Sequence, residues 1–159
     1  MITEIKKGGY VFSVDIEKTR EYYKSNSICN CEYCQNFYKQ IDGRFPELEE
    51  FLAEFGVDIS RPDENMSFDT DNSIEYSLYY TVTGKIDKMH KHEIECGDLD
   101  VFFHQSGSPW VDIPNEQTEP YFIIGVSIFT LPWVLDTPYP SPYIRKNIFT
   151  RLFNRFKKK

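Results

Sequence analysis

The sequence predicts an α+β fold, in which N-terminal helices pack on a mostly antiparallel sheet of about five to six strands, followed by a C-terminal amphipathic helix. Three observations predict it. Apolar residues between positions 16 and 56 recur at helical spacing. From position 74 onwards, apolar and polar residues alternate as they do in half-buried strands. The run 121–131 is apolar on both faces, which is typical of a central strand covered on both sides.

The first third of the chain is expected to form helices after one initial strand over residues 10–16. Asp15, at the end of that strand, suits the N-cap of the first helix because its carboxylate can accept from free backbone N–H groups of the first turn. Pro46 suits the first turn of the third helix, and Gly56 suits its C-terminal cap. The expected helices cover residues 17–24, 30–41 and 46–55.

The remaining strands are expected after position 73. Gly84 is interpreted as a turn between two of them. The acidic residues at positions 63, 64, 69 and 71 are interpreted as solubilising a loop that comes before these strands. The expected strands cover residues 74–82, 85–91, 92–96, 99–105 and 121–131.

The length of 159 residues fits one domain, which we place at residues 1–136. Residues 137–142 form a Pro-rich linker with prolines at positions 138, 140 and 142. Residues 143–159 form a basic amphipathic segment, since their large apolar residues recur at helical spacing. These apolar residues are Ile144, Ile148, Phe149, Leu152, Phe153 and Phe156.

The net charge of −7 divides unevenly along the chain. Residues 1–136 hold all 25 acidic residues and 11 of the 18 basic ones, which gives −14, whereas residues 137–159 hold the other seven basic residues and no acid, which gives +7. A domain this acidic repels phosphates, so nucleic acid is not expected as a partner. For residues 143–159 we expect docking on the acidic domain first, and self-association or binding to an anionic membrane surface as alternatives.

We expect a cytoplasmic protein with reduced thiols. The first seven residues contain none of the apolar sequence of a signal peptide. The longest apolar run, 121–131, is too short to cross a bilayer, which takes about 20 residues. Four cysteines in a chain of this length and composition are not typical of a disulfide framework.

A cluster of three cysteines, Cys29, Cys31 and Cys34, is the main candidate for chemistry. Zinc takes four tetrahedral ligands, and closely spaced thiolates are efficient donors to it. A fourth ligand is expected from Cys96, with His90 or His92 as the alternative. Three partly buried free thiols at the start of a helix are an equally simple interpretation, because cysteine is often buried as a small hydrophobic residue.

The pair Cys31 and Cys34 also has the spacing of a redox-active motif. A thiol at a helix N-terminus is activated because the helix dipole lowers its pKa. In thioredoxin-like folds, however, this motif follows a buried strand, whereas here it follows the polar segment 24–27.

The cysteine cluster and the segments around it resemble a family of uncharacterised bacterial proteins. The resemblance covers roughly residues 10–65 and implies no activity and no catalytic residue. It is carried by the cysteines and by segments 12–23, Asn36-Phe37-Tyr38, 46–55, Phe55-Gly56-Val57-Asp58 and Arg61-Pro62-Asp63-Glu64.

These observations lead to three functional expectations. The first is a non-enzymatic binding or interaction module, in which a structural zinc or a thiol cluster holds residues 29–34. The second is a thiol-dependent redox enzyme that uses Cys31 and Cys34. The third is a peripheral membrane protein anchored by residues 143–159.

Overall fold

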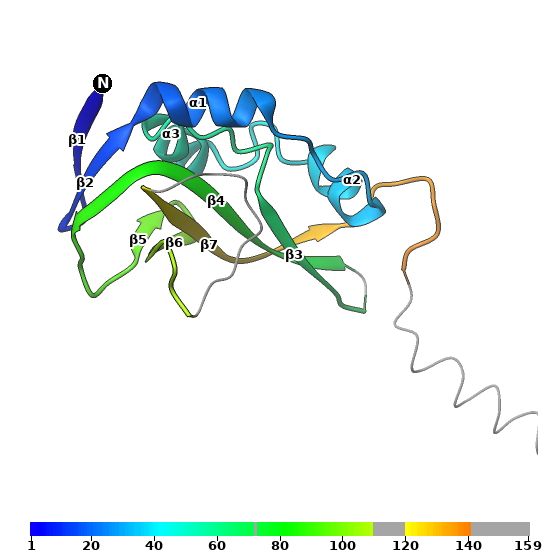
Figure 1. The fold of residues 1–159 in the computed structure, drawn as a ribbon. Helices are drawn as coiled ribbons and strands as arrows, with labels where there is room; N and C mark the ends of the chain where they lie inside the picture. The colour runs from blue at the N-terminus through cyan, green and yellow to red at the C-terminus, as the bar shows by residue number, and fades with distance from the viewer. Residues whose placement is uncertain (72, 110–119, 141–159) are drawn as a thin grey trace, which may run out of the picture.

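A computed structural model describes residues 1–71, 73–109 and 120–140. Within these residues, three helices lie on one face of a seven-stranded sheet (Figure 1). The helices are α1 (Ile16–Ser25), α2 (Glu32–Tyr38) and α3 (Pro46–Glu54). The strands are β1 (Ile2–Lys7), β2 (Tyr10–Asp15), β3 (Glu64–Asp69), β4 (Ser73–Lys88), β5 (Ile94–Cys96), β6 (Leu99–Gln105) and β7 (Tyr121–Pro132).

The sheet is antiparallel and is organised around the 16-residue strand β4. The strand order is β1-β2-β4-β7-β6-β5. Strand β3 pairs with the first half of β4, and β2 pairs with its last residues. Strand β7 lies between β4 and β6, which confirms that residues 121–131 form a central strand. The expected cover on both faces is not seen in the described residues, because the three helices lie on one face and Ile128 of β7 is exposed.

The core lies between the helices and the sheet and is rich in aromatic rings. Phe12 is fully buried at its centre. Its ring lies 5.2 Å from the ring of Phe55 in α3, 4.9 Å from Phe103 in β6 and 5.4 Å from Phe122 in β7. Burial of this many large apolar side chains joins elements that are distant in sequence.

The α+β class is confirmed, and so are the three helices predicted between residues 17 and 55. Asp15 caps α1, and its Oδ1 accepts from the backbone N–H of Lys18 at 3.2 Å. Pro46 stands in the first turn of α3, and Gly56 follows that helix with a φ of +80°. Helix α2 is shorter than expected and ends at Tyr38 instead of Ile41.

The interpretation of Gly84 as a turn is wrong, because β4 continues through it to Lys88. Gly84 lies opposite Val14 of β2, and a Cβ atom there would come within 2.2 Å of the backbone oxygen of Ser13. The glycine allows the close approach of two strands, which is a second common reason for glycine inside a strand.

Two strands were not expected, so the sheet is larger than five to six strands. Strand β1 is mostly exposed, and β3 includes acidic residues that we interpreted as part of a loop. In β3 the alternation Asn65-Met66-Ser67-Phe68 was a signal for a strand. In most strands the apolar side chains face the core, but in β3 the polar ones do. Asn65 pairs with the buried Leu78 and so faces the helices, whereas Met66 and Phe68 face away from them.

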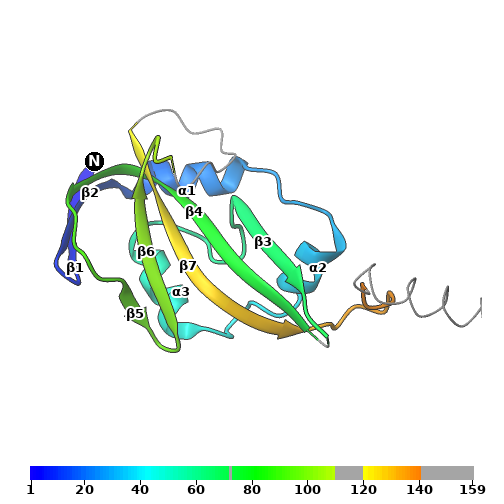
Figure 2. The same ribbon diagram turned by 90° about the horizontal axis from the view of Figure 1, so that it is seen from below.

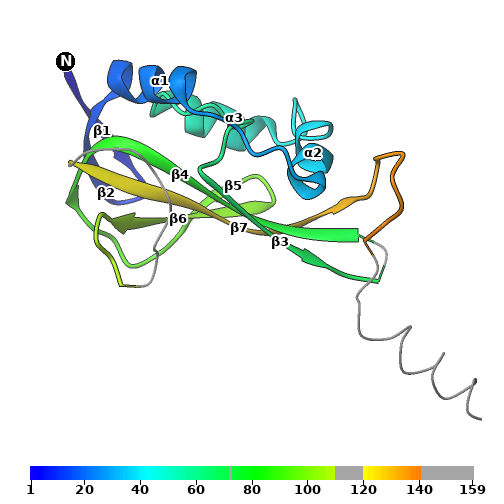
Figure 3. The ribbon, with the colours of Figure 1, turned by 45° about the vertical axis from the view of Figure 1, so that its right-hand side comes forward.

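The chain after β7 folds back on the domain as far as Pro140 (Figure 3). The indole of Trp133 donates to the backbone oxygen of Thr137 at 2.8 Å. The hydroxyl of Tyr139 lies 2.6 Å from the backbone oxygen of Thr70 and 2.7 Å from that of Ser73, at the turn between β3 and β4. The predicted helix over residues 143–159 lies outside the described residues.

Among the helices that the structure describes, none is both long and apolar enough to cross a membrane.

Candidate metal centre

The three clustered cysteines converge at the connection between α1 and α2. Their sulfur atoms all lie within 4.8 Å of one another. Cys29 and Cys31 are exposed, whereas Cys34 is buried. The three cysteines therefore converge as their spacing predicts, and the thiols of Cys29 and Cys31 are accessible whereas that of Cys34 is part of the core.

Local structure explains this convergence. Cys31 is the N-cap residue of α2, with extended backbone geometry, and Cys34 lies three residues later, on the same face of the first turn. The backbone N–H of Gln35 donates to the oxygen of Cys31 at 2.9 Å, and its side chain donates to Asn30 at 3.1 Å. These bonds hold residues 30–35 as a compact turn that carries two of the sulfurs.

Two nitrogen donors point at the sulfurs. The backbone N–H of Cys31 lies 3.5 Å from the sulfur of Cys29. The side-chain nitrogen of Asn65, in β3, lies 3.9 Å from the sulfur of Cys34. Such N–H donors favour the thiolate over the thiol, and the thiolate is the form that binds a metal.

The pKa values of Cys29 and Cys34 shift in opposite directions. The hydrogen bond from the backbone of Cys31 lowers the pKa of the Cys29 thiol. Burial is the main reason that the pKa of Cys34 lies above its usual range, and hydrogen bonds with the other two cysteines raise it further. Burial, followed by the neighbouring charge of Cys34, raises the pKa of the Tyr38 hydroxyl. Without a metal, the thiolate therefore forms more readily at Cys29 than at Cys34.

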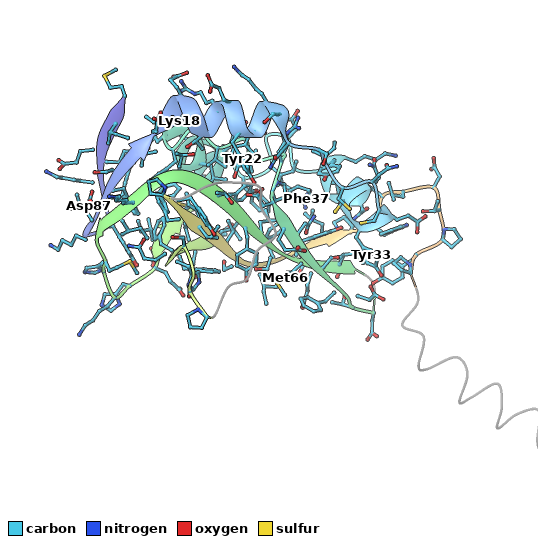
Figure 4. The ribbon with its side chains drawn as sticks, viewed as in Figure 1. Lys18, Tyr22, Tyr33, Phe37, Met66 and Asp87 are labelled. Carbon is cyan, nitrogen blue, oxygen red and sulfur yellow. The ribbon has the colours of Figure 1, made fainter. Side chains whose placement is uncertain are left out.

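Asp63, immediately before β3, anchors the loop that leads to the cysteines. Its carboxylate accepts from the side chain of Asn26 at 3.1 Å and from the backbone N–H of Thr81 at 2.8 Å. It also accepts from the hydroxyl of Tyr22, which reaches from α1 toward the sheet (Figure 4). Burial raises the pKa of Asp63, although these donors act against the rise. One carboxylate thus joins α1, the loop and β4.

Arg61 holds the same loop from a second side, because its guanidinium donates to the backbone oxygen of Asn26. The Nε atom of Arg61 and the Oδ1 atom of Asn65 are buried without a hydrogen-bond partner in the described part of the chain. Both residues line a cleft of about 550 Å³ beside the cysteines. The cleft is lined by Tyr22, residues 26–29, Cys31, Cys34, Tyr38 and residues 61–65.

The expected fourth ligands do not belong to this cluster. Cys96 is buried in β5, where burial raises its pKa to about 11 and the nearby Lys7 lowers it. His90 and His92 lie between β4 and β5, with their rings 5.4 Å apart. Within residues 1–71, 73–109 and 120–140, no further Cys, His, Asp or Glu joins the three sulfurs as a group with mutually close ligand atoms.

The roles of Asp63, Arg61 and Asn65 could not be predicted from the sequence. No spacing rule connects them to the cysteines, since they meet only where the segment before β3 passes the loop after α1. The alternation in residues 65–68 was the one signal that could have placed Asn65 on a strand.

Comparison of the chain with protein-family models, with curated proteins and with solved structures finds no match. The resemblance to a bacterial family therefore stays a prediction.

Proposed function

We propose that this protein is a metal-binding module whose three thiolates, from Cys29, Cys31 and Cys34, hold a thiophilic cation, with Zn²⁺ as the first candidate. The observation that carries the proposal is the mutual approach of the three sulfurs to within 4.8 Å. Zn–S bonds of about 2.3 Å in a tetrahedral site place sulfurs about 3.8 Å apart. A contraction of about 1 Å is within reach of χ1 rotations of the two exposed side chains.

The donor set favours an accessible site. A closed structural zinc site has four protein ligands, whereas here the described residues supply three. Two of the thiols are exposed, and all three line the cleft. A fourth ligand from water, from a small molecule or from a partner would complete the coordination, and a site of this kind can exchange its metal.

The chain around the cysteines suits this role. Asp63 and Arg61 hold Asn26, and α2 holds Cys31 and Cys34, so the ligand loop is attached at both ends. The donors to Cys29 and Cys34 resemble the outer hydrogen bonds that orient metal ligands. A metal bound only by the folded chain adds stability, about 2.7 kcal/mol at a free concentration 100 times its dissociation constant.

A zinc titration of the full chain tests the proposal. Competition with a chromophoric chelator should give one zinc per chain, and Co²⁺ in its place should give a sulfur-to-metal charge-transfer band. Cys29→Ser, Cys31→Ser and Cys34→Ser should each weaken binding strongly, because each removes a thiolate. Cys96→Ala is the matched control, since Cys96 lies in β5 outside the cluster, and it should keep both the stoichiometry and the band.

Two results would contradict the proposal. One is a chain that binds no zinc although its thiols are reduced. The other is equal binding by the wild type and the three serine variants. If the metal-free protein instead reacted with iodoacetamide at one clustered cysteine much faster than free cysteine does, thiol chemistry would be the better account of the same cluster.

A further inference from the structure

The sheet face opposite the helices carries an apolar patch. In the described part of the chain, the three helices cover only one face of the sheet, and Figure 2 views the other face. Three large apolar side chains on that side are exposed: Met66 by 41%, Phe68 by 50% and Ile128 by 61%. We call these three residues the outer patch. Figure 4 shows Met66 on the side of the sheet away from α1.

The pairing register makes the outer patch continuous. Met66 lies opposite Ser77 of β4. Beyond Ser77, the register of β4 against β7 shifts, because Tyr76 pairs with Phe129 and Leu78 pairs with Val126. Residues 127 and 128 therefore lie opposite Ser77, so Met66 and Ile128 flank it from the two sides. Phe68 lies in the next row, opposite Glu75.

We propose that residues 143–159 of the same chain dock on the outer patch as an amphipathic helix. The proposal is independent of the metal site. It would explain why the apolar side chains of β3, Met66 and Phe68, are directed away from the helices. Met66 and Phe68 on β3 and Ile128 on β7 lie on the two sides of β4, and exposed contiguous apolar patches mark binding surfaces.

The described chain ends where such a helix would have to begin. The hydroxyl of Tyr139 lies within hydrogen-bond distance of the backbone oxygens of Thr70 and Ser73, at the turn that joins β3 to β4. Phe68 is two residues before Thr70. Residues 140–142 include two prolines and can span about 9 Å in an extended conformation. That reach is close to the spacing of about 10 Å between two packed layers, so the chain can pass around the turn to the outer face.

The length of the segment also fits. A helix of the 17 residues 143–159 is about 25 Å long. Strands in a sheet are about 4.8 Å apart, so the outermost of the four strands β3, β4, β7 and β6 are about 14 Å apart. The apolar stripe of the segment, which includes Ile148 and Leu152, can therefore cover the outer patch along its whole width.

The positive charge of residues 143–159 also favours their docking on the outer patch. The segment carries seven positive charges and no negative one. The alternation of the strands places Glu64 beside Tyr79, Glu75 beside Phe68 and Asp100 on the outer face with Phe102. Three carboxylates therefore lie around or near the outer patch. They attract residues 143–159 and repel an anionic membrane, which makes the chain itself the better-matched occupant.

Oxidation of methionine by dilute peroxide, followed by peptide mass spectrometry, tests the proposal on the full chain. Met89 is the internal reference, because it is 50% exposed and lies outside the outer patch. Docking predicts that Met66 is oxidised at least severalfold more slowly than Met89. It also predicts that this protection decreases in high salt, because salt screens the attraction between the segment and the carboxylates.

Two matched full-length variants test whether the apolar stripe of residues 143–159 is what protects Met66. Ile148→Glu/Leu152→Glu places two charges in the apolar stripe and should raise the Met66 rate to that of Met89. Asn147→Glu/Asn154→Glu adds the same charge on the opposite side of the predicted helix and should keep the protection. Equal circular dichroism spectra and unfolding midpoints would show that both variants keep the fold.

Three results would overturn the proposal. The first is equal oxidation of Met66 and Met89 in the wild type. The second is protection that disappears on dilution, which would assign the cover to a second copy of the chain. The third is an unprotected Met66 together with flotation of the full chain on phosphatidylserine vesicles, which would assign residues 143–159 to a membrane surface.

Discussion

The side-chain nitrogen of Asn65 lies 3.9 Å from the sulfur of Cys34, although Asn65 belongs to strand β3 and Cys34 to helix α2. The contact exists because β3 directs Asn65 toward the helices. It gives a buried sulfur a hydrogen-bond donor, and a donor at this position stabilises the thiolate that a metal requires.

Replacement of Asn65 by alanine should therefore weaken zinc binding by about tenfold, as is typical when an outer hydrogen bond to a metal ligand is removed. The measurement is competition with a chromophoric chelator. Ser67→Ala is the matched control, because Ser67 faces the same side of β3 one pair further along. Equal losses in both variants would mean that the effect comes from β3 as a whole and not from the donor.

Zinc binding should become tighter as the pH rises. Burial raises the pKa of Cys34 above its usual range, so a metal has to displace a proton from this thiol. Each displaced proton makes the apparent affinity rise about tenfold per pH unit while the thiol is protonated. Affinities measured at several pH values between about 6 and 8 check this. The same affinity at every pH would contradict it.

The hydrogen bond from Tyr22 to Asp63 should contribute more to stability than the exposed hydrogen bond from Tyr33 to Asp69. Tyr22→Phe removes a donor to a largely buried carboxylate and should cost about 1–3 kcal/mol. Tyr33→Phe is the matched control, because the Tyr33 hydroxyl donates to the exposed Asp69 at 2.6 Å. That variant should cost less than about 1 kcal/mol. Urea unfolding measures both, and similar costs would show that burial of Asp63 is not decisive.

Asp63 should also make stability depend on pH. Burial raises its pKa in the folded chain above the unfolded value of about 3.9. The folded state therefore holds the proton more tightly, and the stability from this group is fully present below about pH 3.9. It is lost as the pH rises through the folded pKa.

Asp63→Asn isolates this effect, because the variant cannot titrate at this position while it shares the other groups with the wild type. The difference in the free energy of unfolding, wild type minus variant, should decrease as the pH rises from about 3 to 7. Urea unfolding in the presence of a chelator measures it. A difference that stays constant or increases with pH would contradict the expectation.

Gly125 and Phe102 should be coupled. Gly125 lies opposite Phe102 on the outer face, and a Cβ atom on Gly125 would come within 2.0 Å of the Phe102 ring. Gly125→Ala should therefore cost about 1–3 kcal/mol, because the ring has to move. In a Phe102→Ala background the same substitution should cost much less. A double-mutant cycle by urea unfolding checks this, and equal costs in the two backgrounds would exclude steric coupling.

Features that arise within a few neighbouring residues could be predicted from the sequence alone. Asp15 caps α1, Pro46 starts α3, and β6 covers residues 99–105 as expected, because capping, proline geometry and alternation act locally. The meeting of Cys29, Cys31 and Cys34 belongs to the same class, since a turn of six residues can bring their sulfurs together without help from the rest of the chain.

Features that depend on which strand lies beside which follow only from the tertiary structure. It placed Cys96 in β5 among Lys7 and the acidic residues near α3, outside the cysteine cluster. It also made Gly84 a site of close strand approach. The burial of Asp63 and the direction of Asn65 follow from how β3 pairs with β4. Local propensity carries no information about these pairings, because they are selected by burial of the whole aromatic core.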